Sequence, residues 1–357
     1  MQRTACLVEE VVLGVDTHLH THTAVLIDLL AREIDTHEFP TTKHGYRALI
    51  KWAQGRGTIR RAGVEGTGSY GAGLARQLTL EGITVTEITR PSRRGQRHLG
   101  KTDERDALAA ARAVLVTETA AVPKARDGIV ESIRVLRNTR ASAVKARTQT
   151  GLQLRALVLT APTDLRENLR ELSTKKTVAH CARWHRVDPA DTTKATRLAM
   201  RSLARRHQLL DEEVAELDTH LKQLTKTAAP RLLAEPGIGP ETAARLLIVA
   251  GDNPERLRND AALAALCGAS PIQASSGKTQ RHRLNRGGDR QGNNALWTIA
   301  NNRMIHDPET RAYVERRTAQ GKSTKEIRRC LMRHLARRLF PLLINDINQT
   351  KTTASLT

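Results

Sequence analysis

Aromatic residues are scarce in this chain of 357 residues, which has three tryptophans, three tyrosines and two phenylalanines. This scarcity argues against the aromatic platforms on which some proteins stack runs of single-stranded bases. No apolar run approaches the ~20 residues that a membrane-spanning helix requires. The N-terminus has Glu9 and Glu10 where a secretory signal would carry basic residues. The sequence therefore predicts a cytoplasmic protein with no membrane segment.

Cysteine is also rare, and its four positions lie far apart in the chain: Cys6, Cys181, Cys267 and Cys330. None of them forms the C-x-x-C spacing that is typical of zinc sites and redox centres. We therefore expect reduced thiols, with neither a disulfide framework nor a zinc site.

Acidic residues are outnumbered, because 58 Lys and Arg face 37 Asp and Glu and leave a formal charge of +21. Two segments carry this excess. Residues 124–205 hold 18 basic against 7 acidic residues, and residues 271–340 hold 16 against 5. Such local excess exceeds what solubility requires. The expected partner is a nucleic acid held through its phosphates, close to the nucleoid.

Short β-branched runs alternate with helical patterns over residues 1–123, the first predicted domain. We predict strands at residues 11–16, 24–28, 62–65 and 83–88, with a hairpin joining the first two, and helices at residues 72–80 and 102–117. Strands that alternate with helices indicate an α/β layer fold. Pro123 is the expected end of this domain.

The next predicted segment, residues 124–227, is basic and helical, with long helices at residues 129–159 and 194–225. The second helix has leucines spaced by seven, with Val214 and Leu221 at alternate positions: Leu203, Leu210, Leu217 and Leu224. This seam suits either an antiparallel helix hairpin or a coiled coil between subunits. A mainly helical domain at residues 228–345 and a flexible tail at residues 346–357 are expected to follow.

Four carboxylates stand where predicted elements of the first domain begin or end. Asp16 closes the first strand and Glu65 closes a later one. Asp103 and Asp106 share a face at the start of a helix. Strand ends of an α/β sheet meet at one edge, and oxygen ligands gathered there suit Mg²⁺ or Mn²⁺. Spacing alone also allows helix caps or surface charges at these positions.

Two glycine-containing segments of the C-terminal half have features of phosphate contacts. In Pro236–Gly239 the backbone at Gly237 and Gly239 can approach a DNA phosphate, as in a helix-hairpin-helix, although a simple helix–helix turn has the same sequence. Further on, Ser275 and Ser276 precede Gly277 and a basic cluster: Lys278, Arg281, Arg283, Arg286 and Arg290. Guanidinium groups can offset the charge that develops when a serine attacks a phosphodiester. On chemistry alone, a polar turn is the ordinary role of such a serine pair.

Three stretches resemble the N-terminal half of the DEDD transposases, RuvC-like insertion-sequence enzymes related to the Piv-type DNA invertases: Gly14–Asp28, Val64–Ala75 and Gly100–Val114. The K-[ST]-D-x-x-D-A pattern is the most specific part of the resemblance, which covers most of the chain. It implies an RNase-H-like fold that binds divalent metal through four carboxylates: Asp16, Glu65, Asp103 and Asp106. Because that metal site uses carboxylates, we interpret the neighbouring histidines as ordinary turn and strand residues: His18, His20 and His22.

Residues 268–304 are similar to the C-terminal domain of the same family, which carries a Ser-Gly signature with downstream arginines. The resemblance implies that Ser276 becomes covalently joined to DNA, with Ser275 as the neighbouring alternative. It also implies a structured guide RNA (a bridge RNA) and assembly as a dimer or tetramer. DNA transposition or site-specific recombination is the function we expect.

Two other functions remain open on the sequence. A metal-dependent endonuclease of the Holliday-junction type would use the same carboxylates and would need no serine. A non-catalytic nucleic-acid-binding protein would need neither, and the presence of all four carboxylates argues against it.

Overall fold

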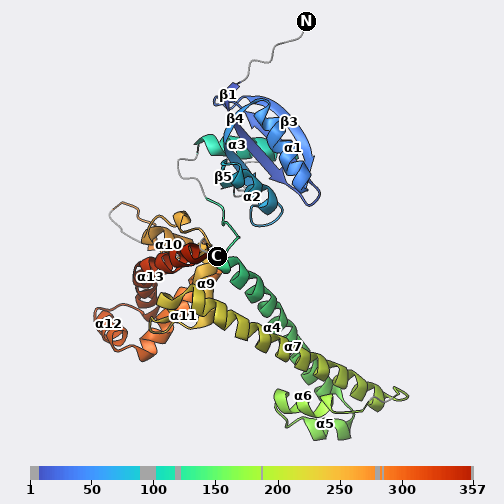
Figure 1. The fold of residues 1–357 in the computed structure, drawn as a ribbon. Coiled ribbons are helices and arrows are strands. Elements are labelled where there is room, and N and C mark those ends of the chain that lie inside the picture. The colour runs from blue at the N-terminus through green and yellow to red at the C-terminus, as the bar shows by residue number, and fades with distance from the viewer. Residues whose placement is uncertain are drawn as a thin grey trace. The chain divides into compact units, whose positions relative to one another are not determined.

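The structure is a computed structural model that describes residues 8–88, 102–116, 122–185, 188–277, 282–283 and 285–354. The chain divides into two compact units (Figure 1). The first consists of Met1–Arg126 with Asn253–Arg258, and the second of Asp127–Asp252 with Asn259–Thr357. Among the described residues, no helix combines the length and the apolarity that crossing a membrane requires.

A five-stranded sheet in the order β3-β2-β1-β4-β5 forms the centre of the first unit. Its strands are β1 (Val8–Thr17), β2 (Thr21–Ile27), β3 (Glu33–Pro40), β4 (Gly57–Glu65) and β5 (Thr84–Ile88). The first three strands are antiparallel neighbours, whereas β4 runs parallel to β1 and β5 runs parallel to β4. Three helices complete the unit: α1 (Lys43–Gln54), α2 (Ala72–Leu80) and α3 (Asp103–Val116).

The alternation of side chains along β1 divides the core of this unit into two layers. Leu13 and Val15 belong to the larger apolar cluster, which includes Leu49 of α1 and Leu74 of α2. Val12 belongs to the smaller cluster, which contains Ala107 and Ala111 of α3. The sheet is therefore buried on both faces, and Asp16 follows Val12 in the alternation that faces α3.

Two glycines allow α3 to lie directly on the sheet. Gly14 of β1 and Gly63 of β4 are partners in the parallel register. A Cβ atom at Gly14 would lie 2.1 Å from the backbone oxygen of Ala107, and one at Gly63 would lie 2.4 Å from that of Ala110. Any larger side chain at either position would push α3 away from the sheet.

The predicted strands, the hairpin and the two helices of the first domain are confirmed, with shifts of a few residues at their ends. The prediction missed β3 and α1. Strand β3 lies at the edge of the sheet and has the polar sequence EIDTHEFP, which lacks a clear apolar alternation. Helix α1 begins at the N-cap Thr42, whose hydroxyl accepts a hydrogen bond from Gly45 N.

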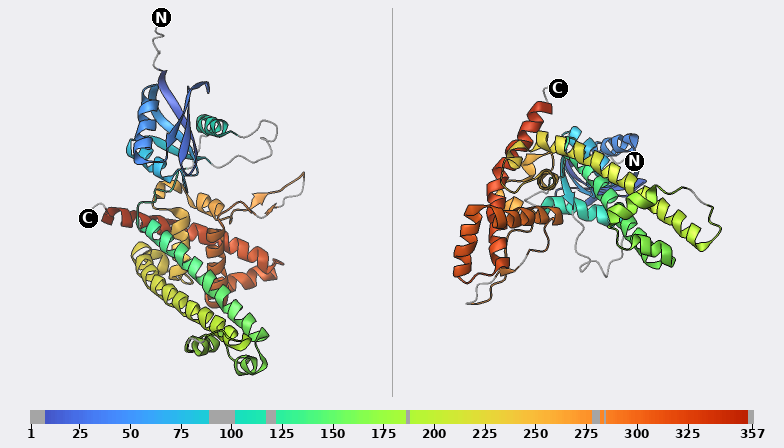
Figure 2. Two further views of the ribbon diagram at one scale, coloured as in Figure 1. Left: turned by 90° about the vertical axis from the view of Figure 1, so that its right-hand side faces the viewer. Right: turned by 90° about the horizontal axis from the view of Figure 1, so that it is seen from below.

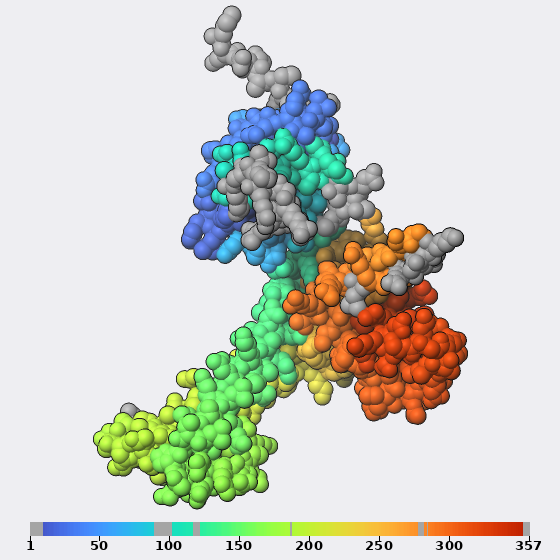
Figure 3. Space-filling view, turned by 180° about the vertical axis from the view of Figure 1, so that it is seen from behind, coloured from blue at the N-terminus to red at the C-terminus, as the bar shows by residue number. Residues whose placement is uncertain are grey.

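The second unit contains a long antiparallel helix pair, α4 (Ile129–Thr160) and α7 (Thr192–Ala228). The short helices α5 (Thr163–Leu169) and α6 (Thr174–Ala182) pack at its far end (Figure 2). Ion pairs of Arg140 with Asp218 and of Arg147 with Asp211 join the two long helices. We call α4–α7 the arm; it extends away from the C-terminal helices of the same unit (Figure 3).

The arm is a helix hairpin within one chain, which is the first of the two arrangements predicted for the helix with leucines spaced by seven. The residues that α7 buries include Met200, Ala204, Val214 and Leu221. The four leucines spaced by seven are only half-buried, because the contact line with α4 passes beside them. A contact of these leucines with a second subunit stays a prediction.

The C-terminal part is helical, as expected, and carries one small hairpin. Its helices are α8 (Pro230–Leu233), α9 (Pro240–Ala250), α10 (Asp260–Leu266), α11 (Arg290–His306), α12 (Pro308–Ala319) and α13 (Thr324–Ala354). Strands β6 (Ile272–Gln273) and β7 (His282–Arg283) form the hairpin. Residues 254–256, a short 3-10 helix, belong to the first unit.

The expectation of a flexible tail from residue 346 is wrong, because α13 continues to Ala354. Asp346 and Ile347 are fully buried in this helix. The Asp346 carboxylate accepts hydrogen bonds from the backbone N–H groups of Arg231 and Leu232, at 3.2 and 3.1 Å. It thereby caps the start of α8, a long-range contact that the local composition does not reveal.

Two buried cysteines are free thiols, Cys181 and Cys267. Cys181 packs in the apolar cluster at the tip of the arm. Burial raises the pKa of the Cys267 thiol to about 12, so this residue behaves as a small apolar side chain. Cys6 lies outside the described residues.

Candidate active site

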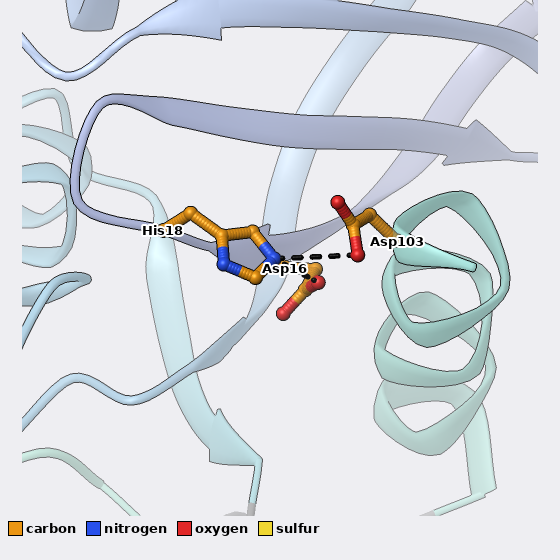
Figure 4. A group of neighbouring side chains, drawn as sticks. All are labelled: Asp16, His18 and Asp103. Atoms are coloured by element: carbon orange, nitrogen blue, oxygen red, sulfur yellow. Dashed lines mark hydrogen bonds and ion pairs between the residues drawn. The ribbon is translucent and has the colours of Figure 1, made fainter. Parts of the chain in front are cut away.

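Three side chains of the first unit meet where β1 ends and α3 begins (Figure 4). His18 Nε2 lies 3.1 Å from Asp16 Oδ2 and 3.3 Å from Asp103 Oδ1. One potential ligand atom from each residue falls within 4.8 Å of the others. Asp16 is only 2% exposed, whereas Asp103 is open to solvent. The group thus combines a buried carboxylate with an accessible one.

The parallel pairing of β1 and β4 brings Glu65 to the same edge of the sheet as Asp16. Val15 is the register partner of Val64, so the two carboxylates follow at equivalent positions. The Thr17 hydroxyl donates a hydrogen bond of 2.9 Å to the backbone oxygen of Glu65 and joins the two strand ends. The site is therefore built on two adjacent strand ends, as is usual in α/β sheets.

Helix α3 supplies the other two carboxylates from its first turn. Thr102 precedes the helix, and its hydroxyl accepts a hydrogen bond of 3.3 Å from Arg105 N. Asp103 and Asp106 lie one turn apart and on the same side of the helix. The close approach of α3 to Gly14 and Gly63 fixes the distance of Asp103 and Asp106 from the sheet.

Electrostatics link all four carboxylates. Burial raises the pKa of Asp16 above its ordinary value; nearby His18 acts in the opposite direction, and the negative charges of Glu65, Asp103 and Asp106 raise it further. Three further carboxylates are thus close enough to disfavour the ionised form of Asp16. A divalent cation would relieve this repulsion, so the oxygen-rich donor set fits Mg²⁺ or Mn²⁺.

His18 lies in this site, although the family resemblance predicts an ordinary turn or strand residue at this position. Asp16 and His18 are separated by two positions, a spacing that places side chains on the same face of an extended chain. That spacing is the sequence signal that places His18 beside Asp16. The resemblance to a family whose metal site uses carboxylates favours the opposite interpretation. His22, by contrast, is fully buried and stacks on Tyr46, with 5.6 Å between ring centroids.

The turn between α8 and α9 contains the two predicted phosphate-contact glycines. Gly237 has a φ of +79°, and a Cβ atom there would lie 2.9 Å from Asn302 Oδ1. The buried Arg303 holds the preceding residues, since it donates to the Pro236 oxygen and to Glu235. Gly239 faces open space, where no atom would meet a Cβ within 4 Å. A phosphate contact at this turn stays a prediction.

Ser276 lies in the hairpin segment between β6 and β7, and it is exposed. Ser275 Oγ accepts a hydrogen bond of 3.4 Å from the Gln273 side chain, and no such bond to Ser276 occurs among the described residues. Gly277 has a φ of +54° and open space around it. Arg283, Arg286 and Arg290 are exposed in the same region. Lys278 and Arg281 lie outside the described residues.

Two protein-family models match the chain, and each matches a segment that carries candidate site residues. Residues 13–161 match a model described as "Transposase", that of the DEDD transposases of the IS110 group, and residues 229–315 match "Transposase IS116/IS110/IS902 family". Both models describe IS110-type transposases, so these matches support an IS110-family transposase. The first match includes all four carboxylates, and the second includes the Gly237 turn and Ser276.

A curated relative supports membership of the IS110 family. It is the "Insertion element IS110 uncharacterized 43.6 kDa protein" of Streptomyces coelicolor, which is 32% identical to this chain over 145 residues. The aligned part covers 40% of this chain and 36% of the relative. The alignment thus spans about a third of that protein.

Proposed function

We propose that this IS110-family protein is a transposase that cuts and rejoins DNA strands with its acidic group and Ser276. The observation that carries the proposal is the convergence of Asp16, His18 and Asp103, with Glu65 and Asp106 close by, at one edge of the sheet. The sheet order, with three antiparallel strands followed by two parallel ones, supports an RNase-H-like fold. Such a site at the strand ends is suited to a phosphodiester substrate.

The four carboxylates would hold Mg²⁺ or Mn²⁺, and His18 is positioned to join them as a nitrogen ligand or to orient Asp16. The bound ion would offset the charge that accumulates on the phosphate oxygens during strand cleavage. The residues of this chain would position the metal and the substrate. Asp16 is fixed by burial, while Asp103 stays accessible to an entering DNA strand.

Ser276 is the proposed nucleophile. Its Oγ would form a bond to the phosphorus atom while the bond from phosphorus to one deoxyribose oxygen breaks. The serine proton leaves to solvent or a nearby base, and the departing deoxyribose oxygen takes up a proton. Because the phosphoester to serine keeps the bond energy, a deoxyribose hydroxyl of another strand can reverse the step and rejoin the DNA. Exposed arginines beside the hairpin support the charge of this reaction.

We also propose nucleic-acid partners for the two basic segments, residues 124–205 and 271–340. DNA ends, target DNA and a structured guide RNA would bind there, and the protein would act as a dimer or tetramer. Sequencing the nucleic acid that co-purifies with the protein tests the guide RNA, and light scattering tests the assembly. Protein that co-purifies with only random fragments would contradict a guide.

The adduct experiment tests the proposed chemistry. We expect unmutated protein to form a denaturant-resistant adduct with element-end DNA in the presence of Mg²⁺, and Ser276→Ala to eliminate it. Ser275→Ala is the matched control and should reduce the adduct only in part. Asp106→Asn should lower cleavage at least about a hundredfold, because it removes a charge that would hold the metal while keeping the side-chain shape.

Three outcomes would overturn parts of this chemistry. Recombination by Ser276→Ala without any adduct would favour the junction-cutting endonuclease, in which water replaces serine. An adduct that persists in Ser276→Ala but disappears in Ser275→Ala would assign the nucleophile to the neighbouring residue. Undiminished cleavage by Asp106→Asn at saturating Mg²⁺ would refute the metal site.

A further inference from the structure

Two hollows of the second unit meet at an exposed tryptophan. One has a volume of about 560 Å³ and the other about 520 Å³. Both are lined by the same four residues at their border: Gly268, Asn285, Asn293 and Trp297. Trp297 is 45% exposed, although most large apolar side chains of this region are buried. We call the two hollows together the Trp297 groove.

The lining of the Trp297 groove is strongly basic. Arg286 and Arg290 line the first hollow, and the second contains a larger set: Arg283, Lys325, Arg328, Arg329 and Arg333. Neither lining contains an Asp or a Glu. Asp260 pairs with Arg333 at 2.7 Å and offsets part of this charge from outside the lining. A surface of this kind attracts a polyanion.

The tryptophan ring lies beside an anchored cation. The Arg328 guanidinium lies 5.5 Å from the centroid of the Trp297 ring. Arg328 is itself anchored, since its Nε donates a hydrogen bond of 2.6 Å to Asn301 Oδ1 on α11. A half-exposed aromatic ring beside cations is an arrangement that can stack a nucleobase while cations hold the adjoining phosphates.

The groove lies at the base of the hairpin that carries Ser276. Pro271 precedes β6 and lines the second hollow, together with His282 and Arg283 of β7. The hairpin extends from this region (Figure 2). A nucleotide in the groove would therefore lie within a short length of strand from the proposed nucleophile.

We propose that the Trp297 groove binds an unpaired nucleobase of a DNA strand, next to the phosphate that Ser276 attacks. This inference rests on the proposed transposase function and gives a site for one feature of its substrate, a locally melted strand. Scarcity of aromatic residues argues against stacking a run of bases, and one tryptophan is sufficient for a single base. The bordering Asn293 donates from Nδ2 to the Cys267 oxygen at 2.9 Å, and its Oδ1 can accept a hydrogen bond from the base edge.

Equilibrium binding by the full-length protein in EDTA tests the proposal. The probes are a fluorescent DNA duplex with three central unpaired thymidines, the same duplex fully paired, and a third in which abasic sites replace the thymidines. Unmutated protein should bind the thymidine probe at least about tenfold more tightly than the other two, in the range that one base–aromatic stack provides. Trp297→Ala should abolish this preference, and Trp297→Phe should retain most of it.

Trp184→Phe is the matched control, because Trp184 also stacks with an arginine, Arg197 at 5.0 Å, but lies at the tip of the arm. It should leave the preference unchanged. Trp297→Leu keeps an apolar side chain against α13, and its thermal melt separates loss of stacking from loss of folding. Absence of a preference in unmutated protein, or an equal loss on all three probes in folded Trp297→Leu, would overturn the proposal.

Two further measurements separate this inference from its alternatives. A tighter complex with the same bulge made of RNA would assign the groove to an RNA base and refute the DNA assignment. The preference should also persist in Ser276→Ala, since binding needs no covalent step. Unmutated protein that shows the preference but forms no adduct would refute the proposed function and leave the base site standing.

Discussion

The two candidate functional regions are built in opposite ways. In the first unit, Asp16 is buried, and Asp103 and Asp106 stand on a helix pressed against the sheet. In the second unit, Ser276 is exposed between strands of two residues each, beside a glycine with open space. The comparison fits the proposed roles of a rigid metal site in the first unit and an adaptable nucleophile in the second. A divalent ion needs fixed ligands, whereas a nucleophile must follow its substrate.

The largest expected effect breaks the rigid side of this comparison. Gly14→Val or Gly63→Val places side-chain atoms where the backbone of α3 now lies, so α3 must move and carry Asp103 and Asp106 with it. We expect loss of Mg²⁺-dependent cleavage and a destabilisation of several kcal/mol. Cleavage assays and thermal melts measure the two effects. Gly55→Ala at the end of α1 is the control, since its φ of −68° suits alanine and its Cβ would lie 3.4 Å from the nearest neighbour, the Trp52 oxygen.

A second effect concerns charge, which differs between the regions. A fourfold rise in salt should lower nucleic-acid affinity on the order of a hundredfold, since bound phosphates release counterions. Arg286→Gln with Arg290→Gln should make the dependence of affinity on salt less steep. Arg47→Gln with Arg60→Gln, in the nearly neutral first domain, should not. Equal salt dependence of affinity in both double variants would show that the charge difference between the regions does not determine nucleic-acid binding.

A smaller effect follows from the pKa of Asp16, which folding raises. The stability that comes from its proton is fully present below the unfolded pKa and is lost as pH rises through the folded pKa. Above the folded pKa of Asp16 the metal-free protein therefore carries an unfavourable buried charge. Asp16→Asn should melt a few degrees higher than unmutated protein in EDTA, and it should gain little from Mg²⁺.

Calorimetry with and without Mg²⁺ measures the melting temperatures of unmutated protein and Asp16→Asn. Unmutated protein should gain stability from the ion, because the ion binds only the folded site. A lower melting temperature of Asp16→Asn in EDTA would contradict the proposed repulsion among the carboxylates.

The smallest effect sharpens the adaptable side. Gly277 has a left-handed φ but open surroundings, so Gly277→Ala should cost only about 1–2 kcal/mol of local strain. Its melting temperature should stay close to that of unmutated protein, while adduct formation slows modestly. A large fall in melting temperature would show that the hairpin is more rigidly packed than its exposure indicates.

The sequence predicted most of the first domain because its strands are β-branched and its helices amphipathic. It also predicted that Asp16, Glu65, Asp103 and Asp106 lie near one another, because their positions at element ends are visible in the pattern, and the structure brings them together. It missed His18, because the spacing of a histidine does not show which carboxylate from another element it meets. The burial of Asp346 depends on a helix start more than 100 residues away, which no local pattern contains. The Trp297 groove is likewise assembled from three separate segments.

The arm also sets a length scale within the protein. At about 1.5 Å per residue, the 32 residues of α4 span about 48 Å. That distance equals about fourteen base pairs of duplex DNA at 3.4 Å each. A nucleic-acid contact at the tip of the arm therefore lies more than one duplex turn from a contact at its base. Removing one heptad from each long helix would shorten this reach by about 10 Å and keep both ends of the arm in place.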